Sequence, residues 1–367
     1  LTTVLSTKLD FDELDTSRKL GEGSFGIVFL GNYRGSTVAI KKLKGMSMDE
    51  KQLDEFYKET AMLDKFRCNY IINYFGACFI PNKICMVTEF AQWGSVNDLM
   101  EKKPNKGDSK DIVRVKILLD AARGIRYLHA NAILHRDIKP DNILVLSIEP
   151  NIKVNAKITD FGASRNINAL VNNRTFTKGI GSPAYMAPEI LDRKKYDSSA
   201  DVYSFAITII ETMTWAEVYP KESFQFAWDI ADFVCDGKRV MKPEGFNDKL
   251  FELVEKCWKH EPRERLNMKE VARELKQIYE EEYGGILEDD FDEEEKQQEV
   301  KIKHHKHHHK GKKQQYSKQK EEKEKSELND EIDNKEKKEE KKSSSENEKK
   351  IEHSEQKEER SEDSESS

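Results

Sequence analysis

The chain has 367 residues, 36% of them charged, and a formal net charge of −7. Residues 287–367 contain 27 acidic and 20 basic side chains, so they carry the whole surplus, and residues 1–286 hold 42 of each sign. A balanced N-terminal part lacks the basic surplus that binding the phosphate backbone of a nucleic acid requires, so no nucleic acid partner is expected.

The cysteines and the apolar runs indicate the cellular compartment in which this chain folds. The five cysteines show no C-x-x-C pair and no metal-ligand spacing, which favours a reducing environment and an intracellular, cytoplasmic location. No apolar stretch approaches the roughly 18 residues of a membrane span, so we expect no membrane segment in this chain. The missing initiator Met suggests a fragment whose parent protein could have one.

Residues 14–90 show the pattern of strands around one helix. The runs 18–23, 26–35 and 36–43 are β-branched and apolar, with glycines between them, which predicts hairpins. Apolar residues at spacings of three and four predict a helix over 48–66, and "ICMVTEF" (84–90) is typical of a short buried strand.

From Ser95 onward the pattern is mainly helical. Ser95 and Asp98 predict a capping box, and a long amphipathic helix follows over 111–130, with Gly124 in its interior. Two strand-like runs cover 142–148 and 155–161. Further helices are expected at 199–213, 221–235, 248–258 and 268–283. The expected architecture is α+β, with a small sheet-rich lobe and a larger helical lobe.

Residues 287–367 are a low-complexity charged segment dominated by Lys, Glu and Ser. Such a segment buries too little apolar surface to offset its chain entropy, so a disordered tail is expected. Its tract 303–310 contains five histidines, which fits either weak metal binding or a solvated stretch.

A glycine-rich motif, "GEGSFGIV", occupies Gly21 to Val28. Alone it is a weak signal, because a plain hairpin explains it equally well. A dinucleotide-binding fold would need a helix after the glycines, whereas here a strand follows. The arrangement favours a flap whose backbone N–H groups close over phosphates.

The run "VAIK" ends at Lys41. A lysine on a strand is more often solvated at an edge. The functional alternative places its ammonium group on nucleotide phosphates, with Glu59 in the following helix as the carboxylate that holds it. Lys42 points to the opposite side of the strand.

The run "HRDIKPDN" (135–142) carries the richest chemistry. Asp137 is a candidate base for an acceptor hydroxyl, Lys139 could neutralise a moving phosphoryl group, and Asn142 offers an amide oxygen to Mg²⁺. Asp160 in "TDFG" supplies a carboxylate for the same ion, although Asp before Gly is also frequent in plain turns.

Taken together, these elements occur in the order and approximate spacing of one known set. From Leu14 to Tyr283 the chain resembles the eukaryotic protein kinase family, and the resemblance extends to "YMAPE", "DVYSF" and "CWKHEPRERL". It implies a bilobal kinase fold over 14–285, with an N-lobe at 14–90 and a C-lobe at 91–285. It also implies ATP and Mg²⁺ as cofactors and proteins as substrates.

The resemblance assigns roles to single residues. Asp137, Lys139, Lys41 and Glu59 would be catalytic, and Asn142 and Asp160 would bind Mg²⁺. Glu189 would form a buried bridge with Arg265, and Asp201 would be structural. The residues implied to bind ATP are Gly21, Glu22, Gly23, Ser24, Phe25, Gly26, Val28, Ala39, Lys41, Thr88, Glu89, Ala91 and Leu144.

The type of kinase follows from finer resemblances. Lys139 and "GSPAYMAPE" resemble Ser/Thr kinases, while "DVYSFAITIIETM" resembles the tyrosine-kinase-like group. The N-terminal residues look like receptor-like kinases of amoebae, which would make the chain the cytoplasmic part of a membrane protein. Two alternatives stay open: a pseudokinase scaffold, disfavoured because Lys41, Asp137 and Asp160 are all present, and a dual-specificity kinase.

Control by phosphorylation is also implied. Arg136 would pair with a phosphate on the activation segment, placed there by an upstream kinase or by a second copy of this chain. The candidate sites are Thr175, Thr177 and Ser182, although Ser182 could instead be a structural hydroxyl. The interval from Asn142 to Asp160 is longer than the family usually shows, which predicts an enlarged hairpin turn behind the site.

Overall fold

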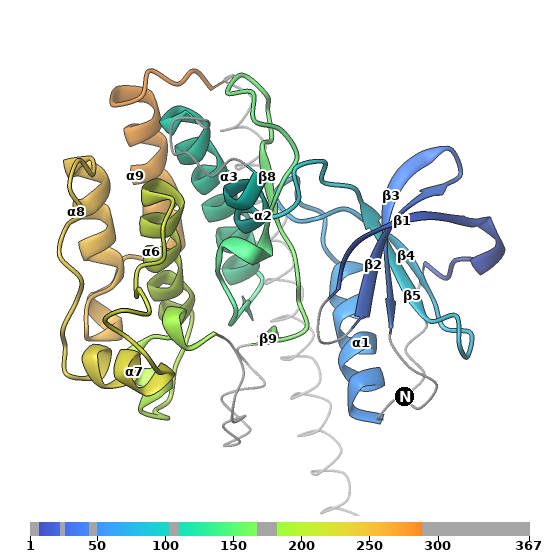
Figure 1. Cartoon of the computed structure of the whole chain (residues 1–367), viewed down its shortest axis with the longest axis horizontal. Helices are drawn as coiled ribbons and strands as arrows, with labels where there is room; N and C mark the ends of the chain where they lie inside the picture. Colours follow the sequence, from blue (N-terminus) through green and yellow to red (C-terminus); the bar gives the residue numbers. More distant parts are fainter. Residues whose placement is uncertain (1–6, 23–25, 44–49, 103–109, 167–181, 288–367) are drawn as a thin grey trace, which may run out of the picture. The chain divides into compact units, whose positions relative to one another are not determined.

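The computed structural model describes residues 7–22, 26–43, 50–102, 110–166 and 182–287 (Figure 1). The predicted disordered tail, the histidine tract, and Gly23, Ser24, Phe25, Thr175 and Thr177 therefore lie outside the described residues.

The N-terminal lobe contains a five-stranded antiparallel sheet. Its spatial order is β1 (Leu14–Glu22), β2 (Gly26–Tyr33), β3 (Ser36–Leu43), β5 (Cys85–Glu89) and β4 (Tyr74–Cys78).

The hairpin between β2 and β3 turns at Arg34 and Gly35, which both have positive φ. Asn32 Oδ1 accepts the N–H of Gly35 at 2.9 Å. Two residues of positive φ match the right-handed twist of the flanking strands. In β3, Val38 and Ile40 are fully buried, so Lys41 lies on the other face.

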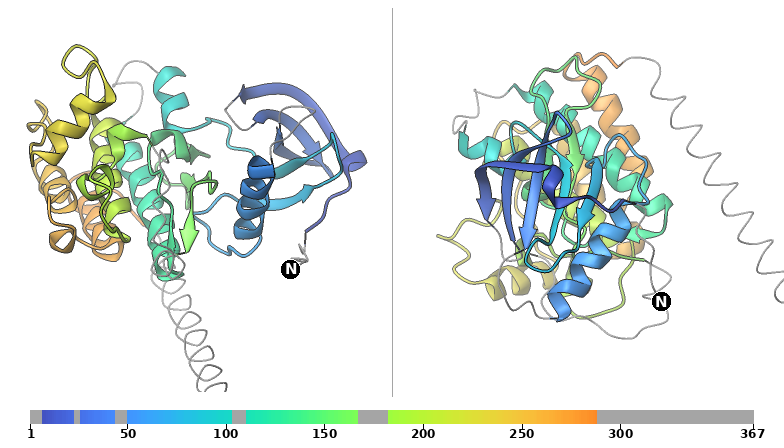
Figure 2. Two further views of the ribbon diagram at one scale, coloured as in Figure 1. Left: turned by 90° about the horizontal axis from the view of Figure 1, so that it is seen from below. Right: turned by 90° about the vertical axis from the view of Figure 1, so that its right-hand side faces the viewer.

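The helix α1 (Glu50–Leu63) lies beside this sheet in all views (Figures 1 and 2). Phe56, Thr60 and Leu63 are buried, and the Phe56 ring makes an edge contact with Phe79 beyond β4. The predicted helix is therefore confirmed, with its end at Leu63.

The C-terminal lobe is mainly helical, as predicted. Its α-helices are α2 (Val96–Lys102), α3 (Asp111–Ala130), α5 (Pro188–Leu191), α6 (Ser199–Thr214), α7 (Ala227–Cys235), α8 (Asp248–Cys257) and α9 (Met268–Glu281). Two short two-stranded antiparallel sheets pair β6 (Ile133–Leu134) with β9 (Arg165–Asn166) and β7 (Ile143–Val145) with β8 (Ala156–Ile158). The 3₁₀ turns among the described residues are η1 (Phe11–Glu13), directly before β1, and, in the C-terminal lobe, η3 (Pro140–Asn142), η4 (Pro183–Tyr185) and η5 (Pro262–Glu264).

The helix predicted over 221–235 is shorter than expected. α7 begins only at Ala227, because Phe226 has an extended backbone and its N–H donates to Asp229 Oδ2 at 2.8 Å. A side chain in the first helical turn that accepts the N–H of the N-cap residue is typical of a helix start, so no helix continues into α7 from the residues before it. Elsewhere in the lobe, the predicted capping box of Ser95 and Asp98 is present.

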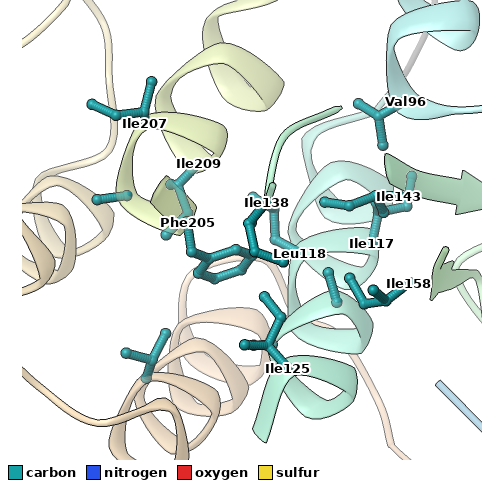
Figure 3. Close-up of a cluster of buried hydrophobic side chains, with 14 of the residues drawn as sticks. Val96, Ile117, Leu118, Ile125, Ile138, Ile143, Ile158, Phe205, Ile207 and Ile209 are labelled. Carbon is teal, nitrogen blue, oxygen red and sulfur yellow. The ribbon is translucent and has the colours of Figure 1, made fainter. Parts of the chain in front are cut away.

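The main apolar core fixes the loop that follows β6 (Figure 3). Ile138 is 1% exposed and lies among side chains of α3 and α6, including Leu118 and Phe205. Burying one such side chain contributes about 1.5–3 kcal/mol. Because Ile138 directly follows Asp137, the core anchors the candidate base.

Within the described residues, no helix has both the length and the apolar character to cross a membrane.

Candidate active site

Lys41 and Glu59 form an ion pair between β3 and α1. The Nζ of Lys41 lies 3.1 Å from each carboxylate oxygen of Glu59, and their side chains are 23% and 8% exposed. Burial by itself would lower the pKa of Lys41, but the carboxylates of Glu59 and Asp160 raise it above its ordinary value. Burial also raises the pKa of Glu59, against the pull of Lys41. We assign both groups as ionised, because two 3.1 Å contacts to an ammonium group favour the carboxylate.

Lys42 points away from this pair, as predicted. Its Nζ donates to Thr16 Oγ1 at 3.0 Å and lies over the rings of Phe11 and Phe29. The alternation of side chains along β3 therefore separates the two lysines.

Asp137, Lys139 and Asn142 meet on the loop between β6 and β7. Asn142 Nδ2 donates to the backbone carbonyl of Asp137 at 2.7 Å and to its Oδ2 at 2.9 Å. Lys139 Nζ lies 2.9 Å from the same Oδ2. Since both contacts of Asn142 use Nδ2, its Oδ1 is the atom left for a cation. Lys139 also donates to Ser182 Oγ at 3.0 Å.

Asp201, at the start of α6, holds the backbone of this loop. Its carboxylate accepts the N–H of His135 at 2.9 Å and of Arg136 at 2.8 Å, and His129 Nε2 lies 2.9 Å away. Burial would raise the pKa of Asp201, but these hydrogen bonds lower it below its usual range. The contacts allow Arg136 to keep a φ of 72°, directly before Asp137.

Asp160 follows β8 in a left-handed conformation, with φ 61°. Thr159 N donates to the carbonyl of Asn142 at 3.0 Å, which ties the two predicted metal ligands through the backbone. Gly162 N donates to Asp160 Oδ1 at 3.3 Å. Among described residues, no group of three or more His, Cys, Asp or Glu side chains could hold a metal ion.

Val28, Ala39, Thr88 and Leu144, which the resemblance assigns to the adenine, lie on β2, β3, β5 and β7. Ala39 pairs with Thr88, and Val28 pairs with Lys41, so these side chains neighbour the ion pair. At Gly26 a Cβ atom would lie 2.5 Å from the carbonyl oxygen of Lys42, so only glycine fits.

The strand β5 ends at Glu89, whose backbone N–H donates to Asn73 O at 2.9 Å. Its carboxylate accepts the N–H of Asn73 at 2.6 Å and pairs with Lys157 of β8. The backbone carbonyl of Glu89 accepts a hydrogen bond from the Thr88 hydroxyl at 3.4 Å.

The predicted bridge between Glu189 and Arg265 is present. Two parallel hydrogen bonds of 2.7 Å join the guanidinium group to the carboxylate, and Arg265 also donates to the carbonyls of Ser199, Lys259 and His260. Both side chains are almost fully buried.

Two further residues near the site escaped the sequence analysis. Glu211 of α6 accepts a 2.6 Å hydrogen bond from the Tyr185 hydroxyl and another from Val218 N at 3.1 Å. Burial raises the pKa of Glu211 to about 7. Arg165 on β9 lies close enough to Arg136 to lower its pKa, after the larger effect of burial. No local sequence pattern marks Glu211 or Arg165, because the side chains with which they interact here are far away in the sequence.

Comparison with known proteins decides the family. The sequence pattern of the family described as protein tyrosine and serine/threonine kinase matches residues 14–275. This chain belongs to the protein kinase family. The predicted fold, with its β-rich N-lobe and helical C-lobe, is thereby confirmed.

The relatives of this kinase are named as serine/threonine kinases or as dual-specificity kinases. A probable serine/threonine-protein kinase, gdt9, of Dictyostelium discoideum is 36% identical over 69% of this chain and 17% of its own length. The dual specificity protein kinase shkB of the same organism is 35% identical over 74% of this chain and 41% of its own. The serine/threonine-protein kinase STY17 of Arabidopsis thaliana is 35% identical over 75% and 46%. The kinase thus spans less than half the length of these relatives.

Proposed function

We propose that this kinase transfers the γ-phosphate of ATP to serine and threonine hydroxyls of proteins, as a non-specific serine/threonine protein kinase that requires Mg²⁺. The observation that carries the proposal is the convergence of Asp137, Lys139 and Asn142 within 3 Å contacts on one loop. The Lys41–Glu59 pair and Asp160 complete the set.

The residues of the N-lobe fit a nucleotide. The close approach of β2 to β3 at Gly26 leaves no room for a side chain, so glycine is required where β2 leaves the proposed flap. In this proposal Val28, Ala39 and Leu144 enclose the adenine, with Thr88 behind it. The flap further includes Gly21, Glu22, Gly23, Ser24 and Phe25, and the backbone of Glu89 and Ala91 supplies hydrogen bonds.

Asn142 Oδ1 and the Asp160 carboxylate are the oxygen ligands that this chain offers to Mg²⁺. Magnesium is usually held by one or two protein carboxylates together with substrate phosphates, so two protein ligands are sufficient. When bound, Mg²⁺–ATP supplies the phosphoryl group and neutralises part of its charge. Lys41, kept protonated by Glu59, adds a positive charge on the phosphates.

Asp137 orients the acceptor hydroxyl and accepts its proton. The Nδ2 group of Asn142 fixes the carboxylate of Asp137, and the ammonium group of Lys139 lies beside it. Positioning and charge stabilisation supply most of the catalysis in phosphoryl transfer. A loop fixed by Asp201 and Ile138 meets that requirement.

The proposal includes a biological setting. We propose control by phosphorylation of Thr175 or Thr177, by an upstream kinase or by a second copy, and a role in signal transduction. All five cysteines are free thiols, which supports an intracellular location. The names of the relatives support serine and threonine as acceptors, and shkB keeps dual specificity as the second candidate.

The test is transfer of labelled γ-phosphate to the protein itself and to a basic generic substrate, for wild type and Asp137→Asn. We expect label in wild type, on serine and threonine, and a loss of at least 100-fold in the variant. Label on tyrosine as well would establish dual specificity. Nucleotide binding without transfer, also after treatment with an activating kinase, would establish a scaffold.

A further inference from the structure

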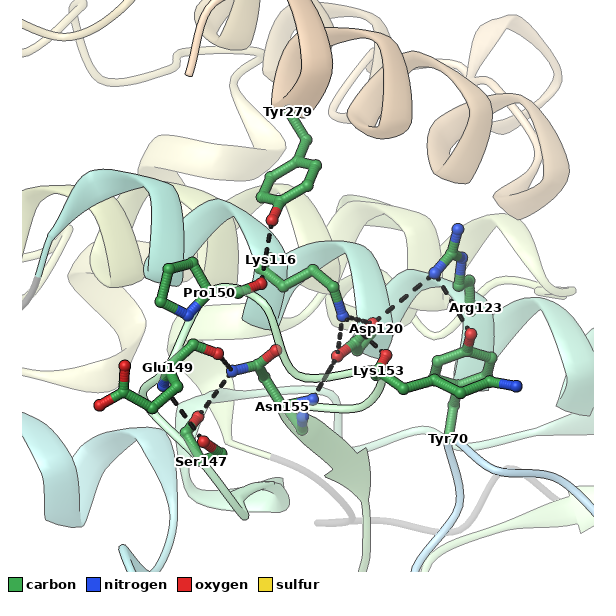
Figure 4. Close-up of polar contacts among 11 residues, drawn as sticks. Tyr70, Lys116, Asp120, Arg123, Ser147, Glu149, Pro150, Lys153, Asn155 and Tyr279 are labelled. Atoms are coloured by element: carbon green, nitrogen blue, oxygen red, sulfur yellow. Dashed lines mark hydrogen bonds and ion pairs between the residues drawn. The ribbon is translucent and has the colours of Figure 1, made fainter. Parts of the chain in front are cut away.

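A buried ion pair lies inside α3 (Figure 4). The Nζ of Lys116 lies 2.7 and 2.8 Å from the two carboxylate oxygens of Asp120, and the two side chains are 1% and 0% exposed. Burial lowers the pKa of Lys116, and Asp120 opposes that effect. Because water is excluded, each charge depends on its protein partners, and a buried pair by itself says little about stability.

Both charged groups of this pair also form hydrogen bonds with backbone groups near the start of β8. Asp120 Oδ2 accepts the N–H of Asn155 at 2.7 Å and of Ala156 at 3.3 Å, and Lys116 Nζ donates to the carbonyl of Lys153 at 3.1 Å. These residues end the connection between β7 and β8, which the sequence predicted to be enlarged. Lys116 and Asp120 of α3 therefore fix the backbone at the start of β8.

The rest of β8 is attached to the segment before β4. Ile158 N donates to the carbonyl of Tyr70 at 2.9 Å, and Ile72 N donates to the carbonyl of Ile158 at 3.0 Å. Arg123 of α3 donates to the Tyr70 hydroxyl at 3.2 Å. At Gly124 a Cβ atom would lie 2.7 Å from the Tyr70 carbonyl, so this glycine lets the segment approach the helix.

We propose that Asp120 is a positioning residue for the metal ligand Asp160, an inference that rests on the proposed function. β8 has only three residues, so few ladder hydrogen bonds fix it. Asp120 fixes its first residue, and the strand leads through Thr159 to Asp160. A displacement at the entry of so short a strand shifts Asp160 relative to Asn142. Groups that orient metal ligands contribute about 10- to 100-fold to metal affinity or activity.

The competing explanation is that the pair only stabilises the fold. Apolar residues of similar volume can replace a buried ion pair without loss of stability. The double variant Lys116→Met/Asp120→Leu removes both charges, and with them the hydrogen bonds to Asn155 and Ala156. Arg123, whose guanidinium lies 3.8 Å from Asp120, keeps its hydrogen bond to the Tyr70 hydroxyl. A purely structural pair would leave this variant with wild-type affinity for Mg²⁺.

The experiment measures the unfolding temperature of the full chain with ADP as Mg²⁺ is varied, and the rate of phosphate transfer at the same concentrations. For Asp120→Asn and for the double variant we expect half-maximal stabilisation at about 10-fold higher Mg²⁺. The control is Asp111→Asn, which removes a partner of Arg114 on the same helix without contact to β8. It should leave the Mg²⁺ dependence unchanged.

An unchanged Mg²⁺ dependence in either Asp120 variant overturns the inference, as does failure of both to fold, which would make the pair purely structural. If instead wild type shows no Mg²⁺-dependent stabilisation by ADP, or Asp160→Asn behaves like wild type, the metal site of the proposed function is refuted.

Discussion

Lys139 donates a 3.0 Å hydrogen bond to the hydroxyl of Ser182, while the same ammonium group lies 2.9 Å from Asp137. The hydroxyl of Ser182 is thus bonded to the loop between β6 and β7. Of the two roles that the sequence left open for Ser182, this contact favours the structural one over a regulatory phosphosite.

Replacing Ser182 tests this role. Ser182→Ala removes the hydrogen bond to Lys139 and should lower the transfer rate about 10-fold, because a hydrogen bond to a charged group contributes about 1.5–3 kcal/mol. Ser182→Thr keeps the hydroxyl and should retain activity. Steady-state rates of both variants are the measurement. Full activity of Ser182→Ala would contradict the positioning of Lys139 by Ser182.

Glu211 should make stability depend on pH. Its pKa is about 7 in the folded protein and about 4.5 when unfolded, so the folded state holds the proton more tightly. Its contribution is fully present below pH 4.5 and disappears as the pH rises through 7. The loss is on the order of 3 kcal/mol. Denaturant unfolding of wild type and Glu211→Gln between pH 5 and 8 measures this loss of stability. The free energy of unfolding of wild type should fall relative to the variant, and parallel curves would disprove the assignment.

The Glu189–Arg265 bridge should be needed for folding. Arg265→Ala leaves the carboxylate of Glu189 buried and unpaired, which should lower the free energy of unfolding by about 3–5 kcal/mol. A matched control is Lys256→Ala, which removes a partly exposed pair with Glu274 and should change it by less than about 1 kcal/mol. Urea denaturation compares the two, and equal effects would show that burial of the bridge is unimportant.

Arg136 should transmit activation. Its half-buried guanidinium group lies over the Tyr196 ring, and burial lowers its pKa, with a further lowering from the charge of Arg165. Two neighbouring cations favour an anion between them. After treatment with an activating kinase, the transfer rate of wild type should rise. The increase for Arg136→Ala should be smaller by about 10-fold or more. Mass spectrometry would identify Thr175 or Thr177 as the modified residue. A variant that responds like wild type would exclude Arg136 as the phosphate ligand.

The local pattern of apolar and turn residues predicted most of the long helices and strands of the kinase. Strands β2 and β3 and helices α1, α3, α6, α8 and α9 follow from apolar spacing and turn residues, because burial on one face imposes a period. The strand β4 and the two-residue strands β6 and β9 carry no such period. They form because neighbouring segments supply hydrogen-bond partners, which a single segment does not reveal.

The sequence by itself determined the family and predicted a candidate site, because the glycine-rich motif, Lys41, "HRDIKPDN" and "TDFG" occur in a fixed order. The sequence also paired Lys41 with Glu59 and Glu189 with Arg265, but the partners of Asp120, Glu211 and Asp201 appeared only in the tertiary structure. Asp120, Glu211 and Asp201 are all buried acids on helices. Asp120 binds the backbone at the start of β8, Glu211 binds Tyr185, and Asp201 binds the backbone of the loop after β6. A buried charge must be satisfied, and the groups that satisfy it come from distant parts of the chain.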